Sequence, residues 1–587
     1  MVVKMIRKLL SCVREYKKPT ILTFLLILGE VIIECLIPFF TAELVNRMKG
    51  DMELRTLVII GICLVLMAIV SLTCGGLAGV TSAKASAGFA KNMRHDIFNK
   101  IQDYSFENID KFSSSSLVTR LTTDVTNVQM AYMMAIRIAV RSPLMLIFSV
   151  VMAYIMGGAL ASAFVIVIPF LATGLILITK NAMPAFHKVF RKYDKLNESV
   201  EENIRGMRVV KGFSREEYEK EKFGKAADEI SKNFIKAERI VAFNQPLMQA
   251  CLYFNMLFIL TIGSKLIITR MGSDLDVGQI SAMLTYGVQV LMSLMTLSMI
   301  YVMVTISFES MKRVVEVLEE DSMLKNPENP ISQVKDGSIE FQNVSFKYSK
   351  KSKKYALADV NLRIQSGMTV GIIGGTGSSK SSLVQLIPRL YDVTKGSVLV
   401  GGVDVRNYDI KVLRDNVAMV LQKNQLFSGT IKENLRWGNE NASDEELIQV
   451  CKMAQADEFI STFPNGYDTH IEQGGSNVSG GQKQRLCIAR ALLKKPKILI
   501  LDDSTSAVDT KTDAMIRKAF REFIPKTTKI IIAQRISSIQ ESDLIIVMEN
   551  GKVSAVGNHQ ELMSNSEIYR EIFEQQTYGK AGEEDHE

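Results

Sequence analysis

Cysteine and histidine are scarce in this chain of 587 residues, and basic runs interleaved with aromatic residues are absent. The seven cysteines form no C-x-x-C pair and no cluster with metal-ligand spacing, so we interpret them as small buried hydrophobic residues. They are Cys12, Cys35, Cys63, Cys74, Cys251, Cys451 and Cys487. The net charge of +8 is modest at this length. Without a basic and aromatic surface signal, the sequence gives no indication of nucleic-acid binding.

The first long apolar run lacks a small-residue cleavage site and is too long for a signal-peptide core, so we expect a retained membrane span. Six basic residues precede it: Lys4, Arg7, Lys8, Arg14, Lys17 and Lys18. Hydrophobic residues make up 47% of the chain, which is high for a soluble protein and low for one that lies wholly in a membrane. The length also exceeds that of one ordinary domain. We therefore expect a membrane part and a soluble part.

Six segments before residue 310 are long and apolar enough to cross a hydrocarbon layer of ~30 Å, which takes ~20 residues. They are Ile21–Leu44, Thr56–Val80, Ser142–Tyr154 with its apolar approach, Ala159–Thr179, Leu247–Ile268 and Val277–Ile306. The basic start and the long basic connections after spans two and four indicate the inner side of the membrane. These connections, Ser82–Gln129 and Lys180–Asn244, have helical periodicity, so they predict helices that extend far beyond the bilayer. Short turns at 105–112 and 212–218 are expected to close them.

The composition changes after Glu320. Residues 321–336 contain Asn-Pro-Glu-Asn-Pro and are typical of a linker. In residues 337–578, short β-branched runs alternate with helical patterns, which predicts an α/β domain with a largely parallel sheet. A polar tail, 579–587, follows. The predicted fold class is therefore an all-α membrane domain of six spans, residues 1–320, followed by an α/β phosphate-loop domain.

A glycine-rich loop follows the buried-strand run Thr369–Ile373 and precedes a helical pattern that begins at Ser382. Backbone N–H groups of such a loop and of the helix start face an anion, so the pattern predicts a phosphate cradle. Lys380 supplies a point charge for the outer phosphates, and the Ser381 hydroxyl can hold Mg²⁺. Ser379 stands where the phosphate-loop pattern has its second glycine. The predicted ATP-binding residues here are Gly374, Gly375, Thr376, Gly377, Ser378, Ser379, Lys380, Ser381 and Ser382.

Two further segments carry polar groups suited to a nucleotide site. A buried strand, Lys497–Leu501, ends in Asp502, which suits an acid that orients Mg²⁺ beside the phosphate loop. Between the two strands, Ser479, Gly480 and Gly481 open another helical run. They form a second anion-binding surface, for which the same chain has no evident need.

Here a family resemblance becomes specific. Val478-Ser479-Gly480-Gly481-Gln482 resembles the signature of the ATP-binding-cassette (ABC) family, and with the phosphate loop and six spans the chain resembles a half-size exporter over nearly its whole length. The resemblance implies that Tyr348 stacks on adenine, that Gln422 belongs to the metal-sensing loop, and that 506–509 makes a cross-dimer contact. It implies Mg²⁺ held by Ser381, Gln422 and Asp502, and coupling helices at the two predicted turns.

The same resemblance implies partners and a location. Two chains would sandwich two ATP molecules, and each ATP would touch one chain's phosphate loop and the other chain's signature, here Ser479, Gly480, Gly481 and Gln482. The chain would be a multi-pass protein of the cell membrane, surrounded by the lipid bilayer. Its ATP-binding domain and both termini would lie in the cytoplasm.

Two residues depart from the family pattern at the γ-phosphate. The family's catalytic base is a Glu directly after the Asp502 position, and here it is Asp503. A general base must come within about 2.6–3.2 Å of its proton or act through a water, so a side chain shorter by one methylene should slow proton transfer. Gln534 occupies the position of the switch histidine. A glutamine donates a hydrogen bond but carries no charge, and none of the five histidines is placed to replace it.

Because both departures meet one phosphate beside an intact signature, the chain resembles the degenerate-site subunit of bacterial heterodimeric multidrug exporters. Its own site would bind ATP and hydrolyse it poorly, while its signature completes the working site of a partner that supplies the Glu and the His. One alternative is a slow homodimer that tolerates Asp503 and Gln534 and exports lipid or peptide. Another is a nucleotide-gated regulator or channel that transports nothing.

Substrate signals are sparse. Glu30 and Glu34 lie one turn apart in the first span, where an ionisable group should face a cavity or a partner. They would contact a cationic substrate or pair with Arg137 or Arg141. Methionines of span six suit an adaptable wall or serve as packing and lipid-facing residues. The predicted cavity residues are Glu30, Glu34, Arg137, Arg141, Met292, Met295 and Met299. Together they favour hydrophobic or cationic amphipathic small molecules, and the missing N-terminal protease-like domain argues against leader-peptide processing.

Overall fold

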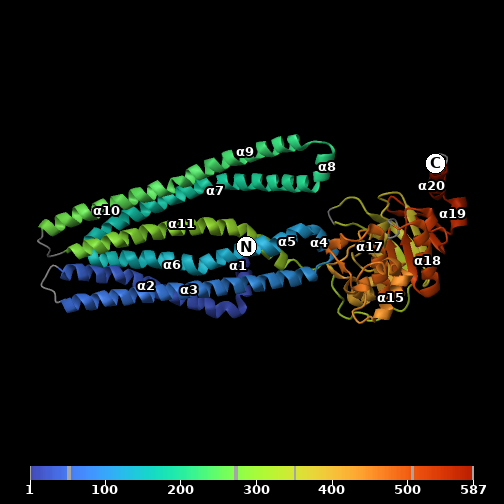
Figure 1. Ribbon diagram of the computed structural model, residues 1–587, viewed down its shortest axis with the longest axis horizontal. Coiled ribbons are helices and arrows are strands. Elements are labelled where there is room, and N and C mark those ends of the chain that lie inside the picture. The colour runs from blue at the N-terminus through green and yellow to red at the C-terminus, as the bar shows by residue number, and fades with distance from the viewer. Residues whose placement is uncertain (1, 49–53, 270–274, 350–351, 504–507, 585–587) are drawn as a thin grey trace. The chain divides into compact units, whose positions relative to one another are not determined.

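A computed structural model describes residues 2–48, 54–269, 275–349, 352–503 and 508–584 (Figure 1). Ser506 and Ala507, half of the predicted cross-dimer contact, lie outside these residues. The chain divides into two compact units, each described here by itself. The first comprises Met1–Gln102 and Ser113–Glu320, and the second comprises Asp103–Phe112 and Asp321–Glu587. The sequence pattern placed residues 103–112 in the membrane domain, whereas in the structure they group with the second unit.

Helices build the whole of the described first unit. They are α1 (Val2–Leu10), α2 (Lys17–Arg47), α3 (Leu54–Gln102), α5 (Ser114–Thr119), α6 (Val125–Gly157), α7 (Ser162–Arg205), α8 (Met207–Gly212), α9 (Glu216–Ala242), α10 (Asn244–Thr269) and α11 (Val277–Glu319), with a 3-10 turn at Ser11–Tyr16 and a π-helical turn at Arg120–Asp124. Six helical segments of the described chain are long and apolar enough to span a membrane, and each contains one predicted span, except that Ala159–Thr179 begins three residues before its segment, Ser162–Arg205. The six-span prediction is therefore confirmed.

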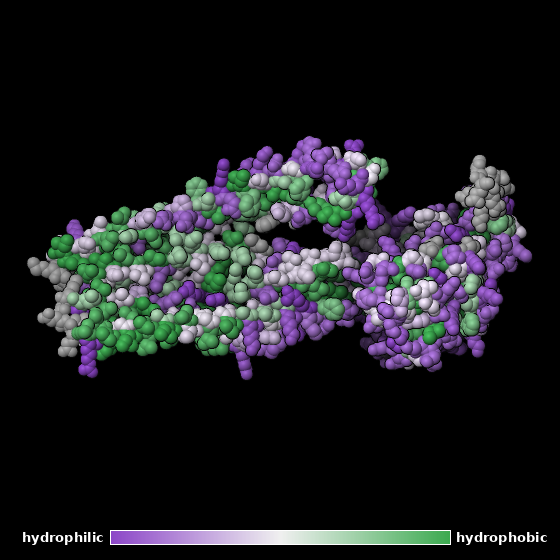
Figure 2. All heavy atoms as spheres, in the orientation of Figure 1, coloured by the Kyte–Doolittle hydropathy of each residue, from purple (hydrophilic) through white to green (hydrophobic). Residues whose placement is uncertain are grey.

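The predicted helical extensions beyond the apolar runs are also confirmed. α3 continues to Gln102, and α7 pairs with α9 along the second extension. Figure 2 shows that the surface of this unit changes from mainly hydrophobic around the C-terminal part of α10 to mainly hydrophilic along the outer parts of α7 and α9. A buried carboxylate fixes the first extension, because Asp124 accepts hydrogen bonds from the Ser310 hydroxyl (2.8 Å) and Arg313 Nε (2.7 Å) of α11.

Both predicted turns contain helix. The first, 105–112, is the short helix α4 (Phe106–Phe112) of the second unit. At the second, α8 ends at Gly212 and α9 begins at Glu216, so the turn itself is shorter than predicted. Between spans three and four, α6 ends at Gly157, and Gly158 adopts φ +51°, which a glycine reaches without steric cost.

The second unit contains the predicted largely parallel sheet. Its strand order is β12-β11-β3-β10-β9-β6, with β12 antiparallel at one edge and the other five strands parallel. The strands are β3 (Thr369–Gly374), β6 (Val417–Val420), β9 (Ile498–Asp502), β10 (Thr528–Ile532), β11 (Leu544–Glu549) and β12 (Lys552–Gly557). Because β10 pairs with both β3 and β9, the loops after these three strands meet at one edge of the sheet.

Smaller sheets and helices complete this unit. An antiparallel sheet of order β2-β1-β4-β5 was not predicted from the sequence. Its strands are β1 (Ile339–Phe346), β2 (Leu357–Ile364), β4 (Lys395–Val400) and β5 (Val403–Asp404), and β7 (Gly429–Thr430) pairs with β8 (His470–Ile471). The helices are α12 (Lys380–Gln385), α13 (Ile410–Asn416), α14 (Ile431–Arg436), α15 (Asp444–Met453), α16 (Asp457–Ile460), α17 (Gly480–Leu493), α18 (Thr510–Phe523), α19 (His559–Asn565) and α20 (Glu567–Glu584). Two apolar cores cover the opposite faces of the parallel sheet, since Ile530 and Ile531 of β10 belong to different clusters.

Candidate functional site

A cavity of about 550 Å³ lies at the edge of the parallel sheet where β3, β9 and β10 end. The predicted phosphate loop, Gly374 to Ser382, lines it together with Gln422, Asp502, Asp503 and Gln534. The structure thus brings together every residue that we predicted to contact the phosphates or Mg²⁺ within this chain. Ile572 of α20 also lines the cavity and was not predicted.

The phosphate loop needs glycine at two of its positions. A Cβ on Gly374 would lie 2.1 Å from the carbonyl oxygen of Met548, and Gly377 adopts φ +81°. Nothing lies within 4 Å of a Cβ built on Gly375 or Gly377, so this side of the loop faces open space. A backbone that is tightly held on one side and open on the other provides the close approach that a phosphate chain requires.

Ser379 adopts the backbone angle that explains the glycine of the family pattern. Its φ of 71° and ψ of 27° are left-handed, and it precedes the first residue of α12. An L-residue in this region costs roughly 1–2 kcal/mol. Serine therefore keeps the backbone N–H in place but adds strain to the loop.

Replacing this residue with glycine should relieve that strain. We expect Ser379→Gly to raise the free energy of unfolding of the ATP-binding unit by about 1 kcal/mol, measured by thermal unfolding of the purified chain. Ser378→Gly is the matched control, because the backbone of Ser378 does not have a positive φ and carries no such strain. Ser378 is buried, and its hydroxyl lies 3.3 Å from Lys380 Nζ. A lower melting temperature for Ser379→Gly would contradict the strain argument.

The cationic and acidic groups of the loop are held at its base. Lys380 Nζ donates to the carbonyl oxygens of Gly374 (2.7 Å) and Gly375 (2.9 Å). The Ser381 hydroxyl donates to Asp502 Oδ1 (2.9 Å). Burial raises the pKa of Asp502, and the hydrogen bond from Ser381 lowers it. A hydroxyl and a carboxylate in contact beside a phosphate cradle form a donor set that suits Mg²⁺.

The two residues that depart from the family pattern contact each other. Gln534 Nε2 donates to Asp503 Oδ2 at 2.7 Å, and Gln422 Nε2 lies 3.5 Å from the same oxygen. Burial raises the pKa of Asp503, while the hydrogen bonds from Gln534 and Gln422 lower it. The carboxylate is thus held between two amides. Behind it, Gln484 of α17 donates to the Asp503 carbonyl at 3.5 Å.

Gln576 of α20 holds the backbone at Gln534 and directly after it, a contact that the sequence did not reveal. Its Nε2 donates to the Gln534 carbonyl (2.7 Å), and its Oε1 accepts from the Ile536 N–H (2.9 Å). Gln534 is therefore held by its side chain, through Asp503, and by its backbone, through Gln576. Gln576 lies 42 residues after Gln534 in the chain, and only the fold joins them.

We expect Gln576→Ala to weaken ATP binding at this site by roughly 5–30-fold, because two hydrogen bonds worth together about 1–2 kcal/mol position Gln534. ADP affinity should stay unchanged, since Gln534 occupies the position predicted to contact the γ-phosphate, which ADP lacks. Titration of the purified chain with each nucleotide measures both affinities. Gln575→Ala, whose Nε2 contacts Glu571 at 3.3 Å, is the neighbouring control. Equal losses for ATP and ADP would mean that Gln576 supports the fold and does not position the switch.

Tyr348, predicted to stack on adenine, contacts the phosphate-loop helix and a second tyrosine. Its hydroxyl lies 2.8 Å from Ser382 Oγ, and its ring packs edge-on against Tyr391 with centroids 5.2 Å apart. The Tyr391 hydroxyl donates to Asp110 of α4 at 2.7 Å. Burial and this hydrogen bond raise the pKa of Tyr391, so it stays a neutral donor. A single aromatic ring therefore joins the predicted adenine position to α4.

The signature residues are placed elsewhere in the unit. Ser479 is the N-cap of α17 and forms a capping box with Gln482, while Gly480 and Gly481 begin the helix. None of these four is among the described residues that line the nucleotide cavity. Ser479 and Gly480 are exposed, so the loop is open to contact from another molecule.

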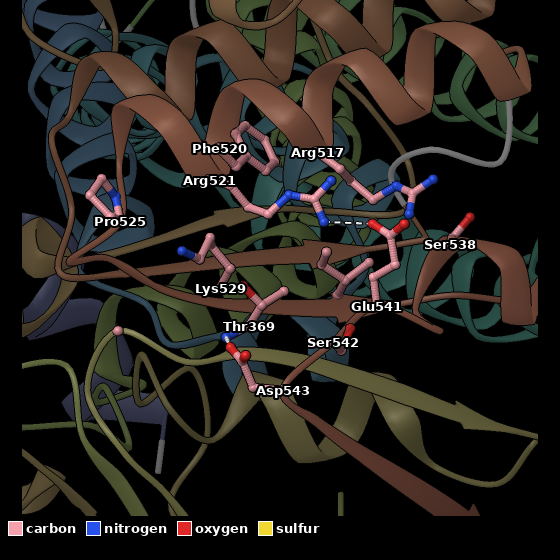
Figure 3. A pocket seen from close by; sticks show the side chains of 12 residues that line it. Thr369, Arg517, Phe520, Arg521, Pro525, Lys529, Ser538, Glu541, Ser542 and Asp543 are labelled. Carbon is pink, nitrogen blue, oxygen red and sulfur yellow. Dashed lines mark hydrogen bonds and ion pairs between the residues drawn. The ribbon is translucent and has the colours of Figure 1, made fainter. Parts of the chain in front are cut away.

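A smaller hollow of about 210 Å³ lies behind the switch loop, between α18 and the start of β10 (Figure 3). Arg521 faces Glu541 in an ion pair of 2.5 Å, and Arg517 pairs with Asp513 at 3.2 Å. The buried Lys529 donates to the Ile524 carbonyl at the end of α18 (3.3 Å), where a cation is favoured by the helix dipole. The Lys529 contact joins the end of α18 to β10, and the Arg521 pair joins α18 to the segment before β11, while the Arg517 pair lies within α18.

In the first unit the structure joins three of the predicted cavity residues. Arg141 Nη2 lies 2.6 Å from Glu34 Oε2, and Arg141 Nε lies 3.3 Å from Glu30 Oε1. Arg137 is exposed, and no ion pair to it is found in the described part of the chain. Met292 and Met299 of α11 are exposed, and Met295 is half-buried.

Comparisons with known proteins agree with both units. Residues 20–319 match the ABC transporter transmembrane region family, and residues 357–506 match the ABC transporter family. The chain is 35% identical to the uncharacterized ABC transporter ATP-binding protein YfiB of Bacillus subtilis, over 98% of this chain and all of the relative. It is 31% identical to the fatty acid ABC transporter ATP-binding/permease protein of Mycobacterium bovis, over 82% of this chain and 75% of that protein.

A solved structure shows the same fold. The structure of a bacterial Atm1-family ABC exporter with ATP bound superposes with a TM-score of 0.83 at 23% identity, covering 95% of this chain and 99% of the other. Six apolar spans, the phosphate-loop domain and a relative matched along its whole length lead to one conclusion. The chain belongs to the ABC transporter family, with a transmembrane region and an ATP-binding domain of that family, and it has the fold of a solved ABC exporter.

Proposed function

We propose that this chain is one subunit of a heterodimeric ABC exporter, that it carries the degenerate ATP site, and that it completes the active site of a different partner chain. The observation that carries the proposal is the contact between Asp503 and Gln534 at 2.7 Å. The base position and the switch position both deviate from the family pattern, and they deviate as an interacting pair.

This pair supports ATP retention better than hydrolysis. Asp503 has an arm shorter by one methylene than the family's Glu, and its Oδ2 accepts a hydrogen bond from Gln534. A carboxylate occupied in this way is a poor acceptor for the proton of an attacking water. Gln534 offers an amide donor to a phosphate oxygen but no positive charge. The expected result is a site that binds ATP and turns it over slowly.

The remaining residues fit nucleotide and metal. Backbone N–H groups from Gly374 to Ser379 would bind the phosphates, and Lys380 would neutralise their charge. Ser381 and Asp502, already 2.9 Å apart, would hold Mg²⁺ with Gln422 beside them. When bound, ATP supplies the phosphoanhydride bond whose hydrolysis drives transport. Tyr348 would hold the adenine ring.

The intact signature supports the role toward a partner. Ser479, Gly480 and Gly481 start α17 and are accessible, while the cavity of their own chain lies elsewhere. We propose that they bind the γ-phosphate of ATP held by the partner. We also propose that the ATP-binding unit and both termini lie in the cytoplasm of a cell-membrane protein, because Lys and Arg accumulate on that side of the spans.

The proposed cargo is an amphipathic small molecule. A cation is not required, because the carboxylates of Glu30 and Glu34 both contact Arg141 within the chain. A lipid with one chain is the second candidate, which the relative named as a fatty acid transporter favours.

Mg-ATP turnover tests the proposal directly. The chain should turn over ATP negligibly alone and briskly when it is produced together with a second half-exporter encoded next to it. Ser479→Arg should abolish turnover of the pair, because a long cation blocks the signature surface. Ser476→Arg is the control, since Ser476 is exposed three residues earlier. Brisk turnover by the chain alone would make the homodimer the better interpretation.

A further inference from the structure

α7 and α11 lie side by side in the membrane-spanning part of the first unit and separate toward the α8 end (Figure 1). A groove of about 700 Å³ opens between them. Its walls are one face of each helix: Ala172, Leu175, Ile176, Thr179, Lys180, Met183 and Pro184 of α7, and Leu294, Leu297, Ser298 and Tyr301 of α11. This volume is within the range of sites that hold small-molecule ligands.

The groove has an apolar part and a polar part. In the apolar part, Leu175 belongs to a buried cluster with Leu171, Cys251 and Leu291 of α7, α10 and α11. Farther along α7 lie Lys180 and Thr179, whose hydroxyl is 3.5 Å from that of Ser298, with Tyr301 also on the α11 wall; Met183 and Pro184 continue the α7 wall beyond them. The groove is therefore amphipathic along its length.

The groove carries positive charge, from Lys180. Lys180 is the sole charged residue among the described residues that line the groove, and no ion pair to it is found in the described part of the chain. It is also the first charged residue after the apolar run Ala159–Thr179, so it lies at the boundary of the hydrocarbon layer. A cationic ligand would meet repulsion here, and an acid would find its counter-charge.

We propose that this groove binds a single-chain acidic amphiphile, with its acid group on Lys180 and the neighbouring hydroxyls and its hydrocarbon chain directed toward Leu175. As the cargo of transport, this assignment rests on the proposed export function and names its substrate class. The binding step itself requires only the groove.

The head group decides the specificity of the groove. A hydrocarbon chain gains little by leaving lipid for an apolar groove, because both surroundings are equally apolar. The interaction that distinguishes the groove from bulk lipid is thus the charge-assisted contact with Lys180. Variants of Lys180 should change the preference among head groups and leave binding of an uncharged chain unaltered.

Photolabelling tests this in the full purified chain, reconstituted in lipid discs without nucleotide. The probe is a fatty acid of eighteen carbons with a photoreactive diazirine in the chain, and the labelled peptides are mapped by mass spectrometry. Labels should fall on the α7 and α11 faces of the groove. Unlabelled oleic acid should compete about tenfold better than oleyl alcohol, and oleylamine should compete no better than the alcohol.

Lys180→Gln should remove the preference for the acid over the alcohol while labelling by an uncharged diazirine chain persists. Lys188→Gln is the matched control, because Lys188 is an exposed lysine of the same helix about 12 Å farther along. It should leave the preference unchanged. Persistence of labelling by the uncharged chain shows that Lys180→Gln is folded.

Three outcomes would overturn the proposal: labels outside the groove, an unchanged acid preference in Lys180→Gln, or competition by a two-chain acidic phospholipid equal to that of oleic acid. If a second chain cross-linked into the groove blocks the labelling, the groove is part of the subunit interface and the proposal is also overturned. Because no nucleotide is present, these results are independent of the turnover experiment. Failure of the degenerate-site proposal would leave the labelling pattern intact.

Discussion

Replacing Asp503 with Glu and Gln534 with His in the same chain is expected to raise ATP turnover at its own site by about 100-fold. A positioned general base contributes roughly 10²–10⁴-fold to such a step. Glu restores the missing methylene, and His restores a group that can carry charge at the γ-phosphate. Turnover should be measured in the pair whose partner has lost its own phosphate-loop lysine, so that the signal comes from this chain's site.

Each single substitution should gain much less than the pair. Asp503 Oδ2 and Gln534 Nε2 are in contact at 2.7 Å, and residues in contact show coupled effects. Adding Lys380→Ala to the double variant is the control, because loss of the loop lysine should abolish the gain at this site. If the double variant stays as slow as the natural chain, the limitation lies outside these two residues, and the degenerate-site proposal loses its chemical basis.

Local patterns were sufficient for the parts of the site that are continuous in sequence. The run from Gly374 to Ser382, the strand that ends in Asp502 and the signature at Ser479 each combine a turn, a strand or a helix start with a characteristic residue set. The structure places the first two beside each other because β3 and β9 both pair with β10. The six spans were predictable for a similar reason, since each is a single long apolar run.

The long-range contacts were not predictable in this way. In the sequence Gln576 is an ordinary polar helix residue, and only the fold brings it to the backbone of Gln534 and Ile536. In the antiparallel sheet of β1, β2, β4 and β5, β1 pairs with β4 across the phosphate loop and its helix, so neighbouring sequence does not show that pairing. In both cases tertiary packing determines which residues or strands are partners, and no local sequence periodicity or motif indicates it.

The contact of Tyr391 with α4 shows what such contacts add to the function. Tyr348 contacts Ser382 of the predicted phosphate loop and also Tyr391, and the Tyr391 hydroxyl donates to Asp110. Two side chains therefore link the predicted adenine position to α4. The resemblance alone implied a coupling helix at 105–112, and the structure supplies the groups that connect it to the nucleotide end of the same unit.

The ion pairs of Arg141 lead to the second large effect. Arg141→Met should lower the free energy of unfolding by about 3–5 kcal/mol, because it leaves the carboxylates of Glu30 and Glu34 without a counter-charge in an apolar span. Thermal unfolding in detergent and the yield of folded protein measure the loss. Arg137→Met is the matched control, one turn earlier on α6, with no ion pair in the described part of the chain. It should change stability far less.

Rescue separates the two interpretations of these carboxylates. If Arg141 serves to neutralise Glu30 and Glu34, then Glu30→Gln and Glu34→Gln should restore most of the stability of Arg141→Met, because an amide pair avoids the cost of buried charge. If the carboxylates instead serve a cationic substrate, Arg141→Met should fold normally and bind cations more tightly, since it frees both acids. The distances of 2.6 Å and 3.3 Å to one guanidinium favour neutralisation. That result would leave the groove beside Lys180 as the charged position available to cargo.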